Sequence, residues 1–153
     1  MKMKFPKVVI VTCFVAVLLS AVAQARIQLP RTSDKIIRPD PAAVAVSNAW
    51  LAIVDAGGYS KSFQQTPARI RAGGEVAEKS FVSWLKSRRA ALGNVISRKV
   101  VRARFSHTMA GAPDGNYEFL DYETSFTRKT SALEIVTLTS ESGHWQVSGY
   151  HIR

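Results

Sequence analysis

Alternating apolar and polar residues fill the C-terminal part of the chain and predict an antiparallel sheet. The alternation runs over Val95–Met109 and again over Tyr117–Thr127, and two shorter runs follow at Leu133–Thr139 and Trp145–Ile152. A period of two places successive side chains on opposite faces of a strand. Turn residues separate neighbouring runs, including the segment Gly111–Gly115. The pattern therefore predicts a four-stranded antiparallel β-meander.

Two helical patterns precede these strands. Asp40 is a suitable N-cap, and Pro41 can occupy the first helical position, where its missing N–H costs nothing. Apolar residues then recur over most of the helix circumference until Gly57, which predicts a buried helix. A second, amphipathic helix is predicted to begin near Glu75 and to be capped by Gly93. The predicted fold class is α+β, with two main helices packed on the meander.

Charged residues predict the pairing of the first two strands. Arg98, Arg102 and Arg104 share one face of the first strand if its alternation is unbroken. Asp121 and Glu123 share the corresponding face of the second strand. Opposite charges across a strand pair each contribute only about 0.2–1 kcal/mol, but like charges there would be unfavourable. The pattern favours a bulge-free hairpin in which the arginines lie opposite the two acids.

The N-terminus has the organisation of a secretory signal peptide. Three lysines precede the apolar stretch Val8–Leu19, and an Ala-Gln-Ala sequence ends at Ala25. This order of basic, apolar and small residues predicts export and cleavage after Ala25, with Ala23 as the alternative site. The apolar stretch is shorter than the about 20 residues needed to span a bilayer, so no stable membrane insertion is expected after cleavage. The predicted location is periplasmic or secreted.

The mature chain fits one domain. Removal of residues 1–25 from 153 leaves 128, which predicts a flexible, proline-containing leader over 26–40 and a single α+β domain over 41–153. Cys13, the only cysteine, leaves with the signal peptide, so the mature chain cannot form an intramolecular disulfide or a cysteine-based metal site. Its charge falls from +10 to +7 with the loss of three lysines. That charge favours solubility and weak attraction to anions.

Spaced glycine and aromatic residues resemble those of a bacterial family known only as domain of unknown function 4019. The motifs that carry the resemblance are Ala49-Trp50-Leu51, Asp55-x-Gly57-x-Tyr59-x-x-Ser62, Gly111-x-Pro113-Asp114-Gly115-x-Tyr117 and Gly143-x-Trp145-x-Val147-x-Gly149-Tyr150. The resemblance implies a cystatin-like fold related to nuclear transport factor 2, in which a curved sheet wraps around helices. It implies no activity, so no catalytic residue is transferred.

Such a cone-shaped fold implies a candidate pocket between sheet and helix. Related ketosteroid isomerases place an acid–base pair there, which requires groups whose surroundings push their pKa values apart. Asp55, Tyr59, His107 and Tyr122 are the candidate pocket residues of suitable type. Each also has a structural interpretation: Asp55, for example, is explained by its place at the end of a helix. The analogy alone therefore favours no catalytic assignment.

The arginine face is a second candidate site. Arg98, Arg102 and Arg104 form a stripe that could attract phosphate groups or lipid headgroups. The alternative, which we favour, is that Asp121 and Glu123 neutralise the stripe.

The sequence predicts no catalytic, cofactor-binding or metal site and no nucleic-acid partner. We expect an exported, non-enzymatic envelope module that binds a small molecule or an envelope protein. The alternative is a small enzyme, similar to an isomerase or dehydratase, with an acid–base site in the cone; a third possibility is a binder of anionic polymers. An enclosed pocket lined by Asp and Tyr, with one displaced pKa, would favour the enzyme, whereas a pocket filled by Trp and Phe would favour the module. Trp50 and Trp84 are predicted to be core residues facing the sheet.

Overall fold

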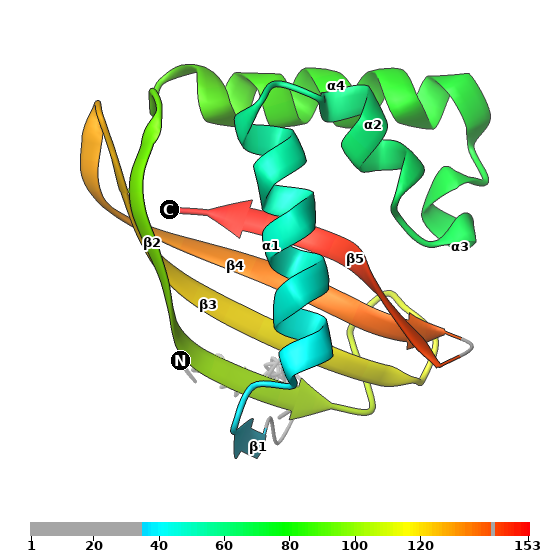
Figure 1. Ribbon diagram of the computed structural model, residues 1–153. Coiled ribbons are helices and arrows are strands. Elements are labelled where there is room, and N and C mark those ends of the chain that lie inside the picture. Colours follow the sequence, from blue (N-terminus) through cyan, green and yellow to red (C-terminus); the bar gives the residue numbers. More distant parts are fainter. Residues whose placement is uncertain (1–34, 142) are drawn as a thin grey trace, which may run out of the picture. The chain divides into compact units, whose positions relative to one another are not determined.

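The computed structural model describes residues 35–141 and 143–153, and it confirms the α+β class (Figure 1). The predicted signal peptide and residues 26–34 of the predicted leader lie outside the described residues. Within those residues no helix is long and apolar enough to cross a membrane. The helices come first along the chain: α1 (Pro41–Asp55), α2 (Tyr59–Gln64), α3 (Ala68–Arg71) and α4 (Gly74–Ala90).

The four predicted strands form an antiparallel meander in sequence order. Their bounds are β2 (Val95–Ser106), β3 (Asn116–Phe126), β4 (Lys129–Glu141) and β5 (His144–Ile152). A short additional strand, β1 (Lys35–Ile37), pairs with β2 and completes the sheet order β1-β2-β3-β4-β5. Residues 35–37 of the predicted flexible leader are therefore part of the sheet. Gly143, between β4 and β5, has a φ of 79°, as a tight hairpin turn requires.

Helix α1 begins and ends where the sequence predicts. The Asp40 carboxylate accepts a hydrogen bond of 2.8 Å from the N–H of Ala42, and Pro41 follows at the first helical position. Gly57, with a φ of 77°, follows the last turn. One side of the helix is buried through large residues such as Trp50 and Leu51.

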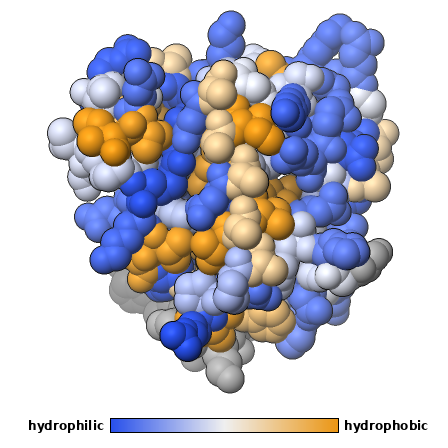
Figure 2. Space-filling model, viewed as in Figure 1, coloured by the Kyte–Doolittle hydropathy of each residue, from blue (hydrophilic) through white to orange (hydrophobic). Residues whose placement is uncertain are grey.

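The prediction that α1 is buried around most of its circumference is wrong. Ala42, Ala45, Ala49 and Ala52 are exposed, and Figure 2 shows a pale orange band of apolar residues running down the surface over this helix. Alanine has a small side chain that loses little free energy by contact with water. The sequence pattern therefore overstated how much of the helix must be covered.

A β-bulge in β2 overturns the predicted register of the arginine face. Val100 pairs with Tyr122, but Arg102 pairs with Asp121, so Val101 is an extra residue between them. An extra residue reverses which face the later side chains occupy. Arg98 consequently shares the inner face of the sheet, the face toward α1, with Val100 and Ala103. Arg102 and Arg104 lie on the outer face.

The core lies between the inner face of the sheet and the helices. Figure 1 shows the sheet curving around α1, with α4 running beside β5. Trp50 is 1% exposed and packs against Tyr150 with ring centroids 5.6 Å apart, so its predicted core position is confirmed. The same prediction for Trp84 is wrong, because that residue is 36% exposed. Leu85, its neighbour in α4, is the residue that enters the core.

Candidate functional site

Four charged side chains meet beneath the C-terminal ends of the two long helices. Asp55 is the last residue of α1, and Arg89 lies in the last turn of α4. Arg98 comes from β2 because the bulge beyond it leaves it on the inner face, and Glu134 comes from β4. Helix C-termini carry partial negative charge, which favours an arginine such as Arg89 at that position. We call these four residues the ion cluster.

Both carboxylates of the ion cluster bridge both arginines. Asp55 lies 2.5 Å from Arg89 and 2.7 Å from Arg98. Glu134 lies 3.2 Å from Arg89 and 2.7 Å from Arg98. The side chain of Glu134 is fully buried, and that of Arg89 is 6% exposed. Two positive and two negative charges compensate one another, as buried charges require.

Two hydroxyl groups complete the surroundings of Glu134. Thr124 Oγ1 donates to Glu134 Oε2 at 2.5 Å, and the Tyr150 hydroxyl donates to Glu134 Oε1 at 2.6 Å. Burial, and then the charge of Glu134, raise the pKa of Tyr150, so its hydroxyl keeps its proton and remains a donor. Although burial opposes its charge, hydrogen bonds to Asp55 and Glu134 raise the pKa of Arg98. Both oxygens of Glu134 thus accept hydrogen bonds from neighbouring side chains, an arrangement that suits a structural role.

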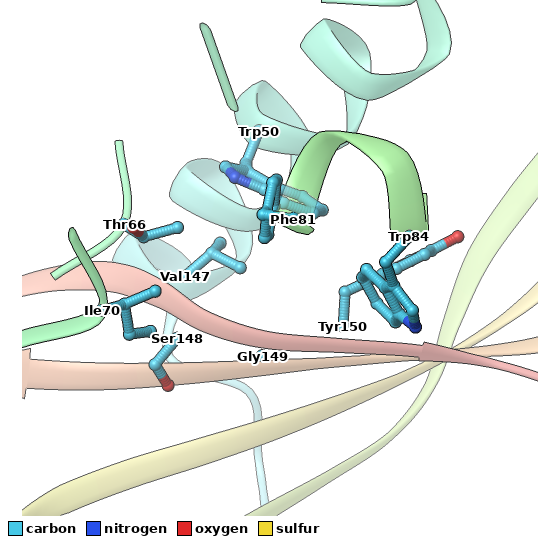
Figure 3. A pocket seen from close by; sticks show the side chains of 9 residues that line it. All are labelled: Trp50, Thr66, Ile70, Phe81, Trp84, Val147, Ser148, Gly149 and Tyr150. Carbon is cyan, nitrogen blue, oxygen red and sulfur yellow. The ribbon is translucent and has the colours of Figure 1, made fainter. Parts of the chain in front are cut away.

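An aromatic pocket lies next to the ion cluster, between α4 and β5 (Figure 3). Its volume is about 220 Å³. Trp84 meets Tyr150 edge-on with ring centroids 6.3 Å apart, and Phe81 lies 6.1 Å from Trp84. We call this cavity the aromatic pocket. Its apolar walls are Trp50, Ile70, Phe81, Trp84, Val147 and Tyr150.

The polar groups around the aromatic pocket are mostly engaged. The Thr66 hydroxyl donates to the carbonyl of Phe63 at 2.8 Å, and the Tyr150 hydroxyl is committed to Glu134. The Ser148 hydroxyl donates to the carbonyl of Thr137 at 3.3 Å. A dry apolar cavity of about 150 Å³ can hold benzene, so this pocket is large enough for one ring or one branched aliphatic group. Its chemistry favours an apolar guest.

The predicted pocket residues do not form one site. Asp55 and Tyr59 both line an open cleft of about 410 Å³ beside the ion cluster. Tyr122 is instead buried beneath α1, with its hydroxyl 2.9 Å from Ser47 Oγ, and burial raises its pKa. His107 is exposed beyond the end of β2, where the bend after Ser106 carries it away from the helices. Its ring stands edge-on to Phe105 at 4.8 Å.

The predicted arginine stripe is divided between the two faces of the sheet. Arg98 belongs to the ion cluster, whereas Arg102 Nε donates to Asp121 at 2.7 Å and Arg104 Nη2 donates to the same carboxylate at 3.2 Å. Pairing with Asp121 is therefore confirmed for these two arginines. The expected role of Glu123 is wrong, because the bulge places it opposite Lys99.

Residues 46–150 match the family model described as "Protein of unknown function (DUF4019)". The chain belongs to this family. No curated protein and no solved structure matches it. The match spans the ion cluster and the aromatic pocket, so both are features of the DUF4019 domain of this chain.

A second pair of acids lies at the other end of the DUF4019 domain, beside the start of α1. Glu118 is 1% exposed and accepts a hydrogen bond of 2.9 Å from the N–H of Asp40. Trp145 Nε1 donates to the Asp40 carboxylate at 3.0 Å, and this bond, together with the Ala42 N–H, lowers the pKa of Asp40. Burial raises the pKa of Glu118. The two neighbouring carboxyl groups therefore differ in how readily they lose a proton.

Replacing Glu118 with glutamine should change how stability depends on pH. Glu118 has an ordinary pKa of 4.5, which burial raises in the folded state. Above that ordinary value the unfolded chain loses its proton first, so the contribution of Glu118 to stability falls as pH rises through the folded-state pKa. Glutamine does not titrate. The free energy of unfolding of Glu118→Gln, minus that of the original protein, should therefore increase between about pH 4 and pH 8.

Urea unfolding at a series of pH values measures this difference. Glu123→Gln provides the control, because Glu123 is an exposed acid on the same strand. A difference for Glu118→Gln that stays constant across the pH range would show that burial does not hold the proton on Glu118.

Glu134 and Arg89 belong to the ion cluster, although no sequence motif predicted a site at either residue. Glu134 shares the inner face of β4 with Val136 and Leu138, which are fully buried. A carboxylate on an apolar face was the available signal, since a buried charge needs a partner. Arg89 lies four residues after the buried Leu85 and so on the same side of α4, which is the corresponding signal for a buried arginine.

Proposed function

We propose that this chain is an exported, non-enzymatic module of the cell envelope that binds an apolar group of a small ligand or of an envelope protein. The binding site is the aromatic pocket between α4 and β5. The basic, apolar and small-residue segments that precede residue 26 support export, with cleavage after Ala25. The mature protein then acts in the periplasm or outside the cell, without a membrane anchor.

The composition of the aromatic pocket carries this proposal. Its side walls are Trp84, Phe81 and Trp50, and sites for small ligands are lined predominantly by apolar and aromatic side chains. The carboxylate bonded to its wall residue Tyr150 is that of Glu134, whose two oxygens already accept hydrogen bonds from arginines and hydroxyls. This supports binding rather than the alternative of acid–base catalysis in the cone, because a general base needs a free lone pair near its substrate.

The fold proposed for this module is the cystatin-like cone related to nuclear transport factor 2. The four-stranded antiparallel meander preceded by two long helices supports that assignment. Such a cone can hold a pocket between its sheet and a helix. The aromatic pocket opens between α4 and β5, in agreement with that proposal.

Titration with indole and with 4-methylphenol tests the proposed pocket. We expect both probes to shift the NMR signals of Trp84 and Tyr150 with dissociation constants of about 1 mM, which is ordinary for fragments of this size. Trp84→Ala should abolish the shift of the Tyr150 signals, which remain observable in that variant. Val76→Ala is the matched control, since Val76 lies on the same helix, is 77% exposed and does not line the pocket.

A polar analogue of similar size, such as glycerol, should not compete. If neither ring compound shifts these signals, or if Trp84→Ala leaves the shifts unchanged, the aromatic pocket is not a binding site and the proposal fails.

A further inference from the structure

We infer that the guest of the aromatic pocket is an extended, acidic peptide segment that pairs with the backbone of β5 and inserts one apolar side chain. This inference rests on the proposed function, and it names the partner of the same site. Four observations carry it: the unpaired edge of β5, the direction of the Tyr150 side chain, the size of the pocket, and the charge of the surrounding segments.

Strand β5 is an edge of the described sheet, since it pairs only with β4. Leu133 and Arg153 exchange both backbone hydrogen bonds, at 2.9 and 3.1 Å. In an antiparallel ladder such pairs alternate with pairs whose N–H and C=O groups point away from the partner strand. This alternation continues from Arg153 toward the start of β5. The backbone N–H and C=O groups of His151 and Gly149 point toward β4, whereas those of Tyr150 point away from it.

No backbone hydrogen bond from Tyr150 to the edge side occurs among residues 35–141 and 143–153. Natural edge strands are commonly protected by proline, by inward-facing charge, by a β-bulge or by a covering segment. Strand β5 has a bulge at Ser148, and its part from Val147 to Tyr150 lines the aromatic pocket. A donor and an acceptor at Tyr150 therefore lie beside a pocket that can hold a side chain.

The direction of Tyr150 connects the edge to the pocket. Its side chain lies on the inner face, between the rings of Trp50 and Trp84 (Figure 3). A residue paired opposite Tyr150 on an added strand would place its own side chain on the same face, with the two Cβ atoms about 5 Å apart. That position lies toward α4, where Phe81 and Trp84 form the wall. Strand addition with a pocket for an alternate side chain is a recurrent way of recognising peptides.

The size of the pocket favours one side chain over a larger ligand. Sites for drug-sized molecules commonly measure about 300–1,000 Å³. The aromatic pocket measures about 220 Å³, close to the space that one phenylalanine or leucine side chain occupies with some clearance.

The surrounding charge favours an acidic peptide. Of the three segments that flank the pocket, Thr66–Ala72 and His144–Arg153 contain no aspartate or glutamate, and α4 contains two glutamates against four basic residues. The first two contain Arg69, Arg71 and Arg153; Arg69 is paired with Glu141. These basic residues would therefore attract acidic residues on either side of the inserted apolar residue. The main effect would be a faster association of the peptide, which slows as the salt concentration rises.

Seven-residue peptides provide the test, with the mature protein and all of its residues intact. The parent peptide has a central phenylalanine between threonine and valine residues and a glutamate at each end. One control peptide has alanine at its centre. Two others carry a single N-methyl group, either on an amide that faces β5 or on the next amide, which faces solvent. Isothermal titration calorimetry gives the affinities, and hydrogen exchange reports on the Tyr150 amide.

We expect the central alanine to weaken binding about tenfold or more, because truncating an anchor residue removes most of its contacts. N-methylation toward β5 should weaken binding about threefold or more, whereas methylation toward solvent should change it little. The peptide should slow exchange of the Tyr150 amide, and binding should weaken as salt rises. Trp84→Ala should reduce peptide affinity about tenfold, with Val76→Ala as the unaffected control.

The outcomes separate this inference from the proposed function. Equal affinity for the two N-methylated peptides, or an unprotected Tyr150 amide, would overturn strand pairing; continued binding of indole would leave the pocket function standing. Loss of both indole and peptide binding would overturn both proposals. A concentration-dependent dimer that protects the Tyr150 amide without peptide would show that a second copy of the chain occupies the edge, and would also overturn this inference.

Discussion

Replacing Glu134 with alanine is expected to lower the free energy of unfolding by about 3–5 kcal/mol, because it leaves the buried Arg89 and the partly buried Arg98 with too little negative charge. Glu134 is fully buried and contacts Arg89 and Arg98. Asp55 remains in the variant, but its side chain is 25% exposed and already engaged with both arginines. The substitution also removes the acceptor of the Tyr150 hydroxyl.

Urea unfolding of Glu134→Ala beside Glu123→Ala measures this effect. Glu123 lies on the neighbouring strand but is exposed, so its removal should change stability by no more than about 0.5 kcal/mol. Glu134→Gln should fall between the two, because the amide keeps one acceptor oxygen and loses the charge. If Glu134→Ala lowers the free energy of unfolding by less than about 1 kcal/mol, the arginines find water or other partners, and the ion cluster does not stabilise the fold.

The ion cluster connects the two long helices to strands that follow them in the sequence. Asp55 is the last residue of α1, and Arg89 lies in the last turn of α4. Arg98 and Glu134 belong to β2 and β4. Replacing such a buried pair by apolar residues can be neutral or stabilising in other proteins. What the charges contribute here is a fixed geometry, since each carboxylate has to meet both guanidinium groups. That geometry holds α4 beside β5 and thereby keeps the aromatic pocket open.

Local patterns predicted the elements of the fold well. The start of α1 follows from Asp40 and Pro41, whose effects act within one helical turn, and the end follows from the positive φ at Gly57. The meander follows from the alternation of each strand. In these cases the residues that determine the structure are close together in the sequence, so a single sequence is sufficient.

The arrangement of the site depends on contacts that the sequence does not specify locally. A bulge at Val101 preserves alternation on each side of itself, so the pattern of β2 agrees with either register. It moves Arg98 to the inner face, and with it the residue that completes the ion cluster. The aromatic pocket depends in turn on where α4 lies relative to β5. Trp84 looked like a core residue from its helix alone because periodicity reports a side of the helix and not the distance to the next element.

Replacing Trp50 with alanine is expected to cost about 3–5 kcal/mol of stability, whereas replacing Trp84 should cost clearly less. Trp50 is 1% exposed, and its Nε1 donates to the carbonyl of Ser62 at 3.0 Å. Its removal leaves a cavity and takes away the shorter of two hydrogen bonds to the Ser62 carbonyl, which keeps one of 3.3 Å from the N–H of Gln65. Trp84 is 36% exposed and forms a wall of the aromatic pocket, so water can enter the space that it leaves.

Urea unfolding of the two variants and of Val76→Ala ranks the three positions under the same conditions. The expected order of destabilisation is Trp50, then Trp84, then Val76, which is 77% exposed. The order for binding of indole is different, because Trp84→Ala should lose binding while remaining folded. If Trp84→Ala instead destabilises the protein as much as Trp50→Ala does, then Trp84 is a core residue whose exposed edge is incidental. The aromatic pocket would in that case be a packing gap between α4 and β5, with no reason to expect a guest there.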